Sequence, residues 1–122
     1  MSKTVMIVDD SESLRQVVNI ALSGAGYKVI EACDGVEALG RLNGKKIHLI
    51  VCDVNMPNMD GITFVKELKQ LPAHKFTPVI MLTTDGHEAK KREGQAAGAK
   101  AWVVKPFHPA QLLAAVSKLI LP

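Results

Sequence analysis

The stretch IHLIVCD at residues 47–53 decides the fold class of this chain. Apart from His48, its first six residues are apolar, and the seventh is Asp53. A short apolar run with almost no alternation predicts a strand buried on both faces, which is typical of a parallel sheet covered by helices. The turn-forming stretch NMPNMDG at residues 55–61 then separates this strand from the next helix.

Outward from this strand, apolar runs alternate with helical patterns along the whole chain. Further strands are predicted at residues 5–8, 27–30, 78–82 and 101–104. Helices are predicted from a cap at Ser11 or Ser13 to Gly24 and Gly26, over residues 36–42, 62–71 and about 87–97, and from Pro109 onward. The first helix should bury one stripe, made of Leu14, Val17, Val18, Ala21 and Leu22. Five strand–helix units of this kind predict an α/β doubly wound parallel sheet with helices on both faces.

The composition favours one globular domain over residues 1–122. Hydrophobic residues make up 48% of the 122 residues and charged residues 22%, which is enough for a substantial core. No run approaches the roughly 18 apolar residues of a membrane span, and residues 1–4 lack the apolar character of a signal peptide. We therefore expect a cytoplasmic protein without a membrane partner.

The cysteines, histidines and basic residues are expected to be structural or solvated and not to form a chemical site. Cys33 and Cys52 lie in apolar stretches, so both are expected to be small buried side chains rather than a disulfide. The four histidines have no metal-ligand spacing; they are His48, His74, His87 and His108. The net charge is only +3, and the basic run at residues 90–92 is expected to be a solvated helix face, so no nucleic-acid partner is expected.

Reactive side chains follow four of the five predicted strands. They are Asp9, Asp10, Asp53, Thr83 and Lys105. If the strand order is the flavodoxin-like 2-1-3-4-5, the three carboxylates converge in one crevice at the carboxyl edge of the sheet. Their repulsion favours a hard divalent cation, and ligands that are all oxygens favour Mg²⁺. Together with an ammonium and a hydroxyl group, this set suits phosphoryl chemistry, with a carboxylate as the nucleophile.

These residues resemble the receiver domains of bacterial two-component response regulators, and the resemblance covers nearly the whole chain. It rests on the motifs VDD at residues 8–10, DVNMPNMDG at 53–61, LTT at 82–84, AGA at 97–99 and KPF at 105–107. The single-domain, CheY-like chemotaxis members are the most similar group. The resemblance implies the 2-1-3-4-5 order. It also implies that the chain is not an enzyme but a phosphoacceptor signalling protein that promotes its own phosphorylation and dephosphorylation.

The resemblance also implies roles for the site residues. Asp53 would accept the phosphoryl group from a sensor histidine kinase. Asp10, Asp53 and the main-chain carbonyl of Asn55 would hold Mg²⁺, and Asp9 would orient a metal-bound water. Thr83 would hydrogen-bond the phosphoryl group, and Lys105 would pair with Asp53. The peptide bond from Lys105 to Pro106 is usually cis in this family.

A second group of expectations concerns output. Thr83 and Trp102 would form the switch, with the aromatic side chain moving inward on activation. Trp102 stands where the family has Tyr or Phe, and its indole N–H needs a partner if it is buried. Val54 replaces the aromatic residue that often follows the phosphoacceptor, and His108 is a weaker cap than Asp, Ser or Thr. The protein is expected to be a monomer that docks a target protein on its fourth helix, fifth strand and fifth helix. A flagellar motor switch protein is one candidate for this target.

Other classes of protein fit the residues less well. A phosphatase of the haloacid dehalogenase class needs an Asp where Asn55 stands, a flavin carrier needs more aromatics, and no phosphate-binding glycine motif is present. Because no effector domain follows the last predicted helix, output through a separate protein is expected. The main alternative is a stand-alone receiver in a phosphorelay unrelated to motility. Asn55 and Asp85 resemble short-lived, chemotaxis-type members in the positions that influence self-hydrolysis.

Overall fold

The computed structural model describes residues 3–42, 45–84 and 88–120, and its centre is a five-stranded parallel sheet in the order β2-β1-β3-β4-β5. The strands are β1 (Thr4–Val8), β2 (Lys28–Ala32), β3 (Leu49–Asp53), β4 (Val79–Thr83) and β5 (Ala101–Val104). The doubly wound architecture and the strand order expected from the sequence are both confirmed.

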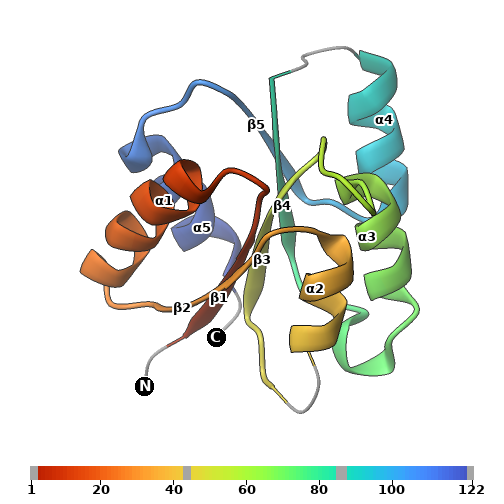
Figure 1. Ribbon diagram of the computed structural model, residues 1–122, viewed down its shortest axis with the longest axis horizontal. Helices are drawn as coiled ribbons and strands as arrows, with labels where there is room; N and C mark the ends of the chain where they lie inside the picture. Colours follow the sequence, from red (N-terminus) through yellow and green to blue (C-terminus); the bar gives the residue numbers. More distant parts are fainter. Residues whose placement is uncertain (1–2, 43–44, 85–87, 121–122) are drawn as a thin grey trace.

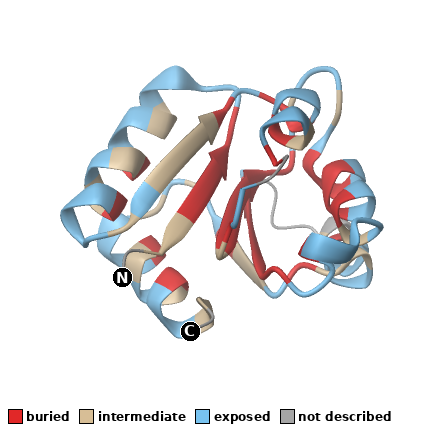
Figure 2. Ribbon diagram, turned by 90° about the horizontal axis from the view of Figure 1, so that it is seen from below, coloured by how far each residue is buried: buried red, intermediate tan, exposed pale blue. Residues whose placement is uncertain are grey.

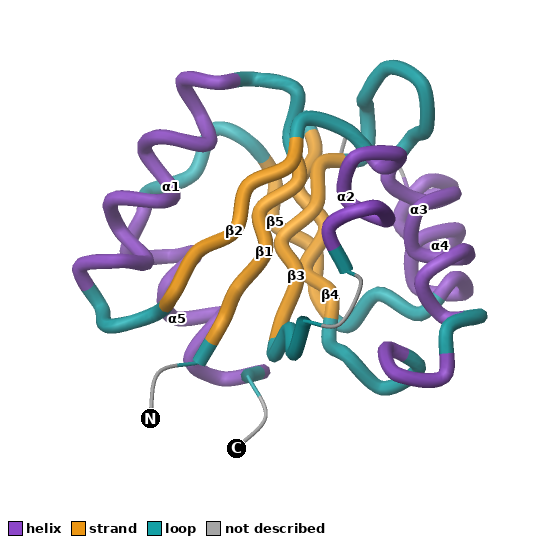
Figure 3. The backbone as a smooth tube through the Cα atoms, turned by 60° about the horizontal axis from the view of Figure 1, so that its bottom comes forward, coloured by secondary structure: helices purple, strands orange, loops and turns teal. Residues whose placement is uncertain are grey.

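Helices cover both faces of this sheet (Figures 1 and 3). They are α1 (Glu12–Gly24), α2 (Gly35–Arg41), α3 (Gly61–Lys69), α4 (Glu88–Ala97) and α5 (Pro109–Leu119), with a short 3-10 helix, η1 (Pro72–His74), before β4. Helices α1 and α5 lie on one face, and α2, α3 and α4 lie on the other. This arrangement follows from right-handed crossovers between parallel strands.

Two hydrophobic layers sandwich the sheet, because successive strand residues point to opposite faces. In β1, Val5 and Ile7 pack toward α1 and α5, whereas Met6 and Val8 pack toward α2 and α3. Figure 2 shows that the central strands are buried, while the outer surfaces of the helices are exposed. Strands covered on both sides need apolar residues throughout, which explains the continuous runs in the sequence.

Most element boundaries lie within two residues of the prediction. Ser11 is the cap of α1, because its Oγ accepts a hydrogen bond from the Leu14 N–H at 3.2 Å. Strand β2 extends to Ala32, two residues beyond its predicted end, because the ladder with β1 continues through the pair Val8–Ala32. Pro109 is the first residue of α5, and the side chain of His108 makes no capping hydrogen bond, as expected for a weak cap.

Two burial predictions are wrong. Val17 is 50% exposed, because only the line through Val18 and Leu22 faces the sheet and Val17 is turned away from it. Cys33 is exposed, because β2 ends at Ala32 and Cys33 begins the loop to α2. Cys52 is buried as expected, and both thiols are free.

The remaining structural expectations have simple outcomes. His74 is buried beside Thr77, and His48 Nδ1 accepts a hydrogen bond from the Thr4 N–H at 3.0 Å. Arg92 is exposed on α4, as expected for a solvated face, whereas His87 and Asp85 lie outside the described residues. Among the helices of the described chain, none combines the length and the apolar character that a bilayer crossing requires.

Candidate functional site

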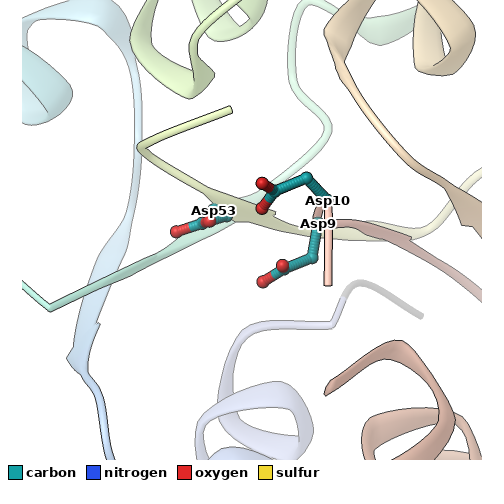
Figure 4. Close-up of side chains that lie close together, drawn as sticks. All are labelled: Asp9, Asp10 and Asp53. Carbon is teal, nitrogen blue, oxygen red and sulfur yellow. The ribbon is translucent and has the colours of Figure 1, made fainter. Parts of the chain in front are cut away.

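Three carboxylates meet at the carboxyl edge of the sheet, where β1 and β3 lie side by side. Val8 is in register with Cys52, so Asp9 and Asp53 leave neighbouring strands at the same level. Each of Asp9, Asp10 and Asp53 offers a carboxylate oxygen, and these oxygens lie within 4.8 Å of one another. In Figure 4 the three carboxylates project to the same side of the strand ends. The predicted convergence is therefore present.

Asp9 is held in place by the protein on both of its carboxylate oxygens. Oδ1 accepts a hydrogen bond from the Ser11 N–H at 2.9 Å, and Oδ2 accepts one from Lys105 Nζ at 3.0 Å. Asp9 is fully buried, whereas Asp10 is exposed. Because protein donors already engage Asp9, it is better suited to orienting the site than to ligating an ion directly.

Lys105 reaches the same cluster from the end of β5. Its Nζ lies 3.4 Å from Asp53 Oδ1, and its main-chain N–H donates to the carbonyl of Thr83 at 2.6 Å. The peptide bond from Lys105 to Pro106 is cis. Burial alone would lower the pKa of Lys105, but the hydrogen bond to Asp9 and the charge of Asp53 outweigh it and raise the pKa. Lys105 therefore stays charged at this edge.

The electrostatic environment of Asp53 differs from that of an ordinary carboxylate. Burial, followed by the negative charge of Asp9, raises the pKa of Asp53 to about 6, although Lys105 opposes this shift. Asp10 adds a smaller repulsion in the same direction. A positive ion near these groups would relieve the repulsion, so the site is electrostatically prepared for a cation.

Oxygen donors of this kind fit Mg²⁺. The cluster in the described chain contains carboxylates and neither imidazole nor thiolate ligands, and Mg²⁺ is usually bound through one or two carboxylates with several waters retained. Asn55 follows Asp53 by two residues, and it is exposed at the start of the loop. The donor chemistry is consistent with the ligand set expected from the sequence.

The loop after β3 is fixed by contacts that sequence reasoning missed. Asn58 has a positive φ of 68°, and its Nδ2 donates to Asp34 Oδ2 at 2.7 Å, which ties the loop to the cap of α2. Gly61 donates its N–H to the Val54 carbonyl at 2.8 Å. A Cβ on Gly61 would lie 2.1 Å from the Asp53 carbonyl oxygen, so only glycine fits there. The turn chemistry of residues 58–61 was the available signal.

Arg15 is a second residue that the sequence did not identify. Its Nη1 donates to the Asp9 carbonyl at 2.6 Å, and its Nε pairs with Glu31 Oε1 at 3.1 Å. Arg15 therefore braces the main chain of Asp9 from α1 and β2. The only signal in the sequence was its position one turn into the helix that follows Asp9 and Asp10. This signal is weak, because an arginine on an amphipathic helix is usually solvated.

Thr83 and Trp102, the two residues expected to form a switch, lie on adjacent strands. Thr83 is fully buried at the end of β4, and Trp102 on β5 is half-buried against the layer formed with α4. The indole ring occupies the space that a side chain on Gly94 would need, because a Cβ there would lie 2.4 Å from Cζ3. Trp102 Nε1 is buried without a hydrogen-bond acceptor among the described residues.

Comparison with known proteins identifies the family. Residues 5–117 match the response regulator receiver domain. The chain belongs to this family, and it is therefore a receiver domain of a signalling protein.

Solved structures of similar proteins share its fold over all or nearly all of their length. The chemotaxis protein CheY4 of Vibrio cholerae is 45% identical with a TM-score of 0.95, and the match covers 98% of this chain and 100% of that chain. The receiver domain of the Francisella response regulator 1452 is 31% identical with a TM-score of 0.88, covering 97% and 96% of the two chains.

Curated relatives include transcriptional regulators. The alkaline phosphatase synthesis transcriptional regulatory protein PhoP of Bacillus subtilis is 38% identical over 120 residues, which are 98% of this chain and 49% of the relative. The chain spans about half the length of the curated relatives it matches. Similarity to these proteins therefore concerns their receiver parts.

Proposed function

We propose that this chain is a phosphorylation-controlled switch that accepts a phosphoryl group on Asp53 and then docks a target protein. The observation that carries the proposal is the convergence of Asp9, Asp10 and Asp53 with the ammonium of Lys105 at one edge of the sheet. The domain would extend over residues 1–122.

Asp53 is the nucleophile in the proposed reaction. A carboxylate oxygen attacks the phosphorus of a phosphohistidine on a sensor histidine kinase, the new P–O bond forms, and the P–N bond breaks as imidazole leaves. With a pKa of about 6, Asp53 is mostly ionised near neutral pH and can act as this nucleophile. Lys105, which already lies 3.4 Å from Asp53 Oδ1, neutralises charge on the incoming phosphoryl oxygens.

Asp10, Asp53 and the carbonyl of Asn55 would hold Mg²⁺, with Asp9 orienting a water in the same site. When bound, Mg²⁺ supplies positive charge that offsets the carboxylates and the charge developing on the phosphoryl group. Asp9 suits the orienting role because Ser11 and Lys105 already occupy its two oxygens. Thr83 would donate its hydroxyl hydrogen to the phosphoryl group.

Intact-mass spectrometry after incubation with acetyl phosphate tests this chemistry. We expect one added phosphoryl group in the presence of Mg²⁺, none after chelation, and none in Asp53→Asn. Thermal denaturation gives a second readout, because an ion that binds only the folded chain raises its melting temperature. Asp10→Asn should lose most of the Mg²⁺-dependent rise, whereas Asp60→Asn, which removes an exposed carboxylate charge outside the cluster while keeping an oxygen that can cap α3, should keep it. Equal phosphorylation of another residue in Asp53→Asn would refute the assignment.

The output proposed for this switch is docking of a target on α4, β5 and α5, in chemotaxis. The likeness to Vibrio cholerae CheY4 favours chemotaxis, with a flagellar motor switch protein as the candidate target. A phosphorelay unrelated to motility is the second candidate, since regulators such as PhoP share the same receiver part. A pull-down with beryllofluoride-treated and untreated protein distinguishes them by the partner that is retained only after activation.

A further inference from the structure

A hollow lies at the amino end of the strands, at the end of the sheet opposite the aspartate cluster. Its volume is about 520 Å³, and it is lined by Leu42, residues 45–48 and most of the segment 72–77. Figure 1 shows both segments at the lower end of the sheet, whereas β1 and β3 end at its upper end. Asp9 directly follows β1, and Asp53 is the last residue of β3. Nothing in the phosphorylation chemistry uses this hollow.

Hydrogen bonds fix the walls of the hollow. Thr77 donates its N–H to the His74 carbonyl at 3.1 Å, and its own carbonyl accepts from Lys69 Nζ at 2.5 Å. His74 Nδ1 lies 3.3 Å from Thr77 Oγ1, and His48 Nδ1 accepts from the Thr4 N–H. The wall that contains His74 and Thr77 is therefore preformed, and a partner would not have to order it on binding.

The hollow has an apolar floor and a positively charged rim. Leu42, Ile47, Pro72 and Ala73 supply apolar lining, and the described lining residues include no carboxylate. Lys45 and Lys46 are exposed on one side.

An exposed aromatic residue also lines the hollow. Phe76 is 79% exposed, and Lys75 beside it is also exposed, with its Nζ 5.7 Å from the Phe76 ring centre. Burial lowers the pKa of both His48 and His74, so the lysines carry the positive charge at neutral pH.

This anatomy fits an acidic peptide better than other anionic partners. Protein interfaces place an apolar anchor in a central pocket and surround it with a polar rim, which is the arrangement present here. The apolar surface continues into a neighbouring depression that includes Leu39 and Leu71 but also Glu67. A carboxylate there opposes a continuous polyanion such as nucleic acid, and a single exposed aromatic side chain is a small anchor for a membrane.

We propose that the hollow at the amino end of the strands is a docking site for an acidic peptide segment of a partner, with an apolar side chain seated between Lys45–Lys46 and Phe76. The site lies at the end of the sheet opposite Asp53. It could therefore hold a partner while the aspartate cluster is being phosphorylated, and the proposal does not depend on that chemistry.

Fluorescence polarisation with a labelled peptide tests the proposal, the probe being one leucine flanked on each side by two glutamates. We expect binding below millimolar concentration and at least about fivefold weaker binding for the double variant Lys45→Glu, Lys46→Glu. Lys66→Glu with Arg92→Glu changes the net charge equally at exposed positions outside the hollow, and it should bind like the unaltered protein. Phe76→Ser should weaken binding without lowering the melting temperature, since Phe76 is exposed.

Several results would overturn the proposal. They are no binding at millimolar peptide, equal loss in the two double variants, and equal binding of a peptide with glutamine in place of glutamate. Tighter binding of single-stranded DNA or of anionic lipid vesicles would assign the surface to another class of partner. Asp53→Asn should bind the peptide normally, so a failed phosphorylation test and a failed docking test are distinguishable.

Discussion

Replacing Gly61 with alanine should damage both the stability and the phosphoacceptor site. The new Cβ would lie 2.1 Å from the Asp53 carbonyl oxygen and 2.9 Å from Met81 Cε, whereas real Cβ contacts stay above 3.0 Å. The main chain must therefore move by roughly 1 Å in a closely packed region, and overpacking of this kind costs about 1–3 kcal/mol. Weakening the hydrogen bond from Gly61 to the Val54 carbonyl adds about 1 kcal/mol.

Calorimetry and phosphorylation provide the assays for this substitution. A loss of about 2–4 kcal/mol corresponds to a melting temperature about 10 °C lower for a domain of this size. Phosphorylation from acetyl phosphate should slow at least about tenfold even well below the melting temperature, because the carbonyl that moves belongs to Asp53 itself. Gly40→Ala is the matched control: its Cβ would have no neighbour within 4 Å, and its stability should be unchanged or slightly higher. A Gly61→Ala protein that melts within about 2 °C of the unaltered chain would refute this reasoning.

Three further substitutions test the switch residue and the buried titratable groups. Gly94→Ala should push the Trp102 indole outward, giving red-shifted emission and stronger acrylamide quenching; unchanged emission would mean that the ring and Gly94 are not in contact. His74 is buried with a lowered pKa, so below about pH 6.5 the unfolded chain binds a proton that the folded chain does not, and the free energy of unfolding should fall as the pH drops. In urea titrations at several pH values, His74→Gln should reduce this dependence of the free energy of unfolding on pH. Asp53 has a raised pKa, so its ionisation lowers the stability of the folded chain as the pH rises from about 4 to about 6. Without Mg²⁺, the Asp53→Asn protein should therefore be more stable than the unaltered chain by about 1–2 kcal/mol at pH 8, and nearly equal to it at pH 4. Equal stability at pH 8 would contradict the raised pKa of Asp53 in the folded chain.

The local sequence determined the elements and the chemistry of the main site. Continuous apolar runs require strands covered on both faces, and this requirement alone predicts the parallel sheet. The carboxyl ends of parallel strands meet at one edge, so the positions of Asp9, Asp53 and Lys105 after strands, together with the strand order implied by the family resemblance, placed them in one site. Element ends do not follow from the sequence in the same way, because the ladder between β1 and β2, and not the residue types, decides that β2 continues to Ala32.

Only the tertiary structure decided how side chains far apart in the sequence constrain one another. Arg15 braces the Asp9 carbonyl, Asn58 bonds to Asp34, and Gly94 makes room for Trp102, and each contact joins elements that periodicity treats separately. Burial was misjudged at Cys33 for the same reason: hydrophobicity is a property of the residue, but exposure depends on which elements cover it. Sequence spacing fixes which groups reach an edge of the sheet, whereas packing fixes which of their atoms remain available to a ligand.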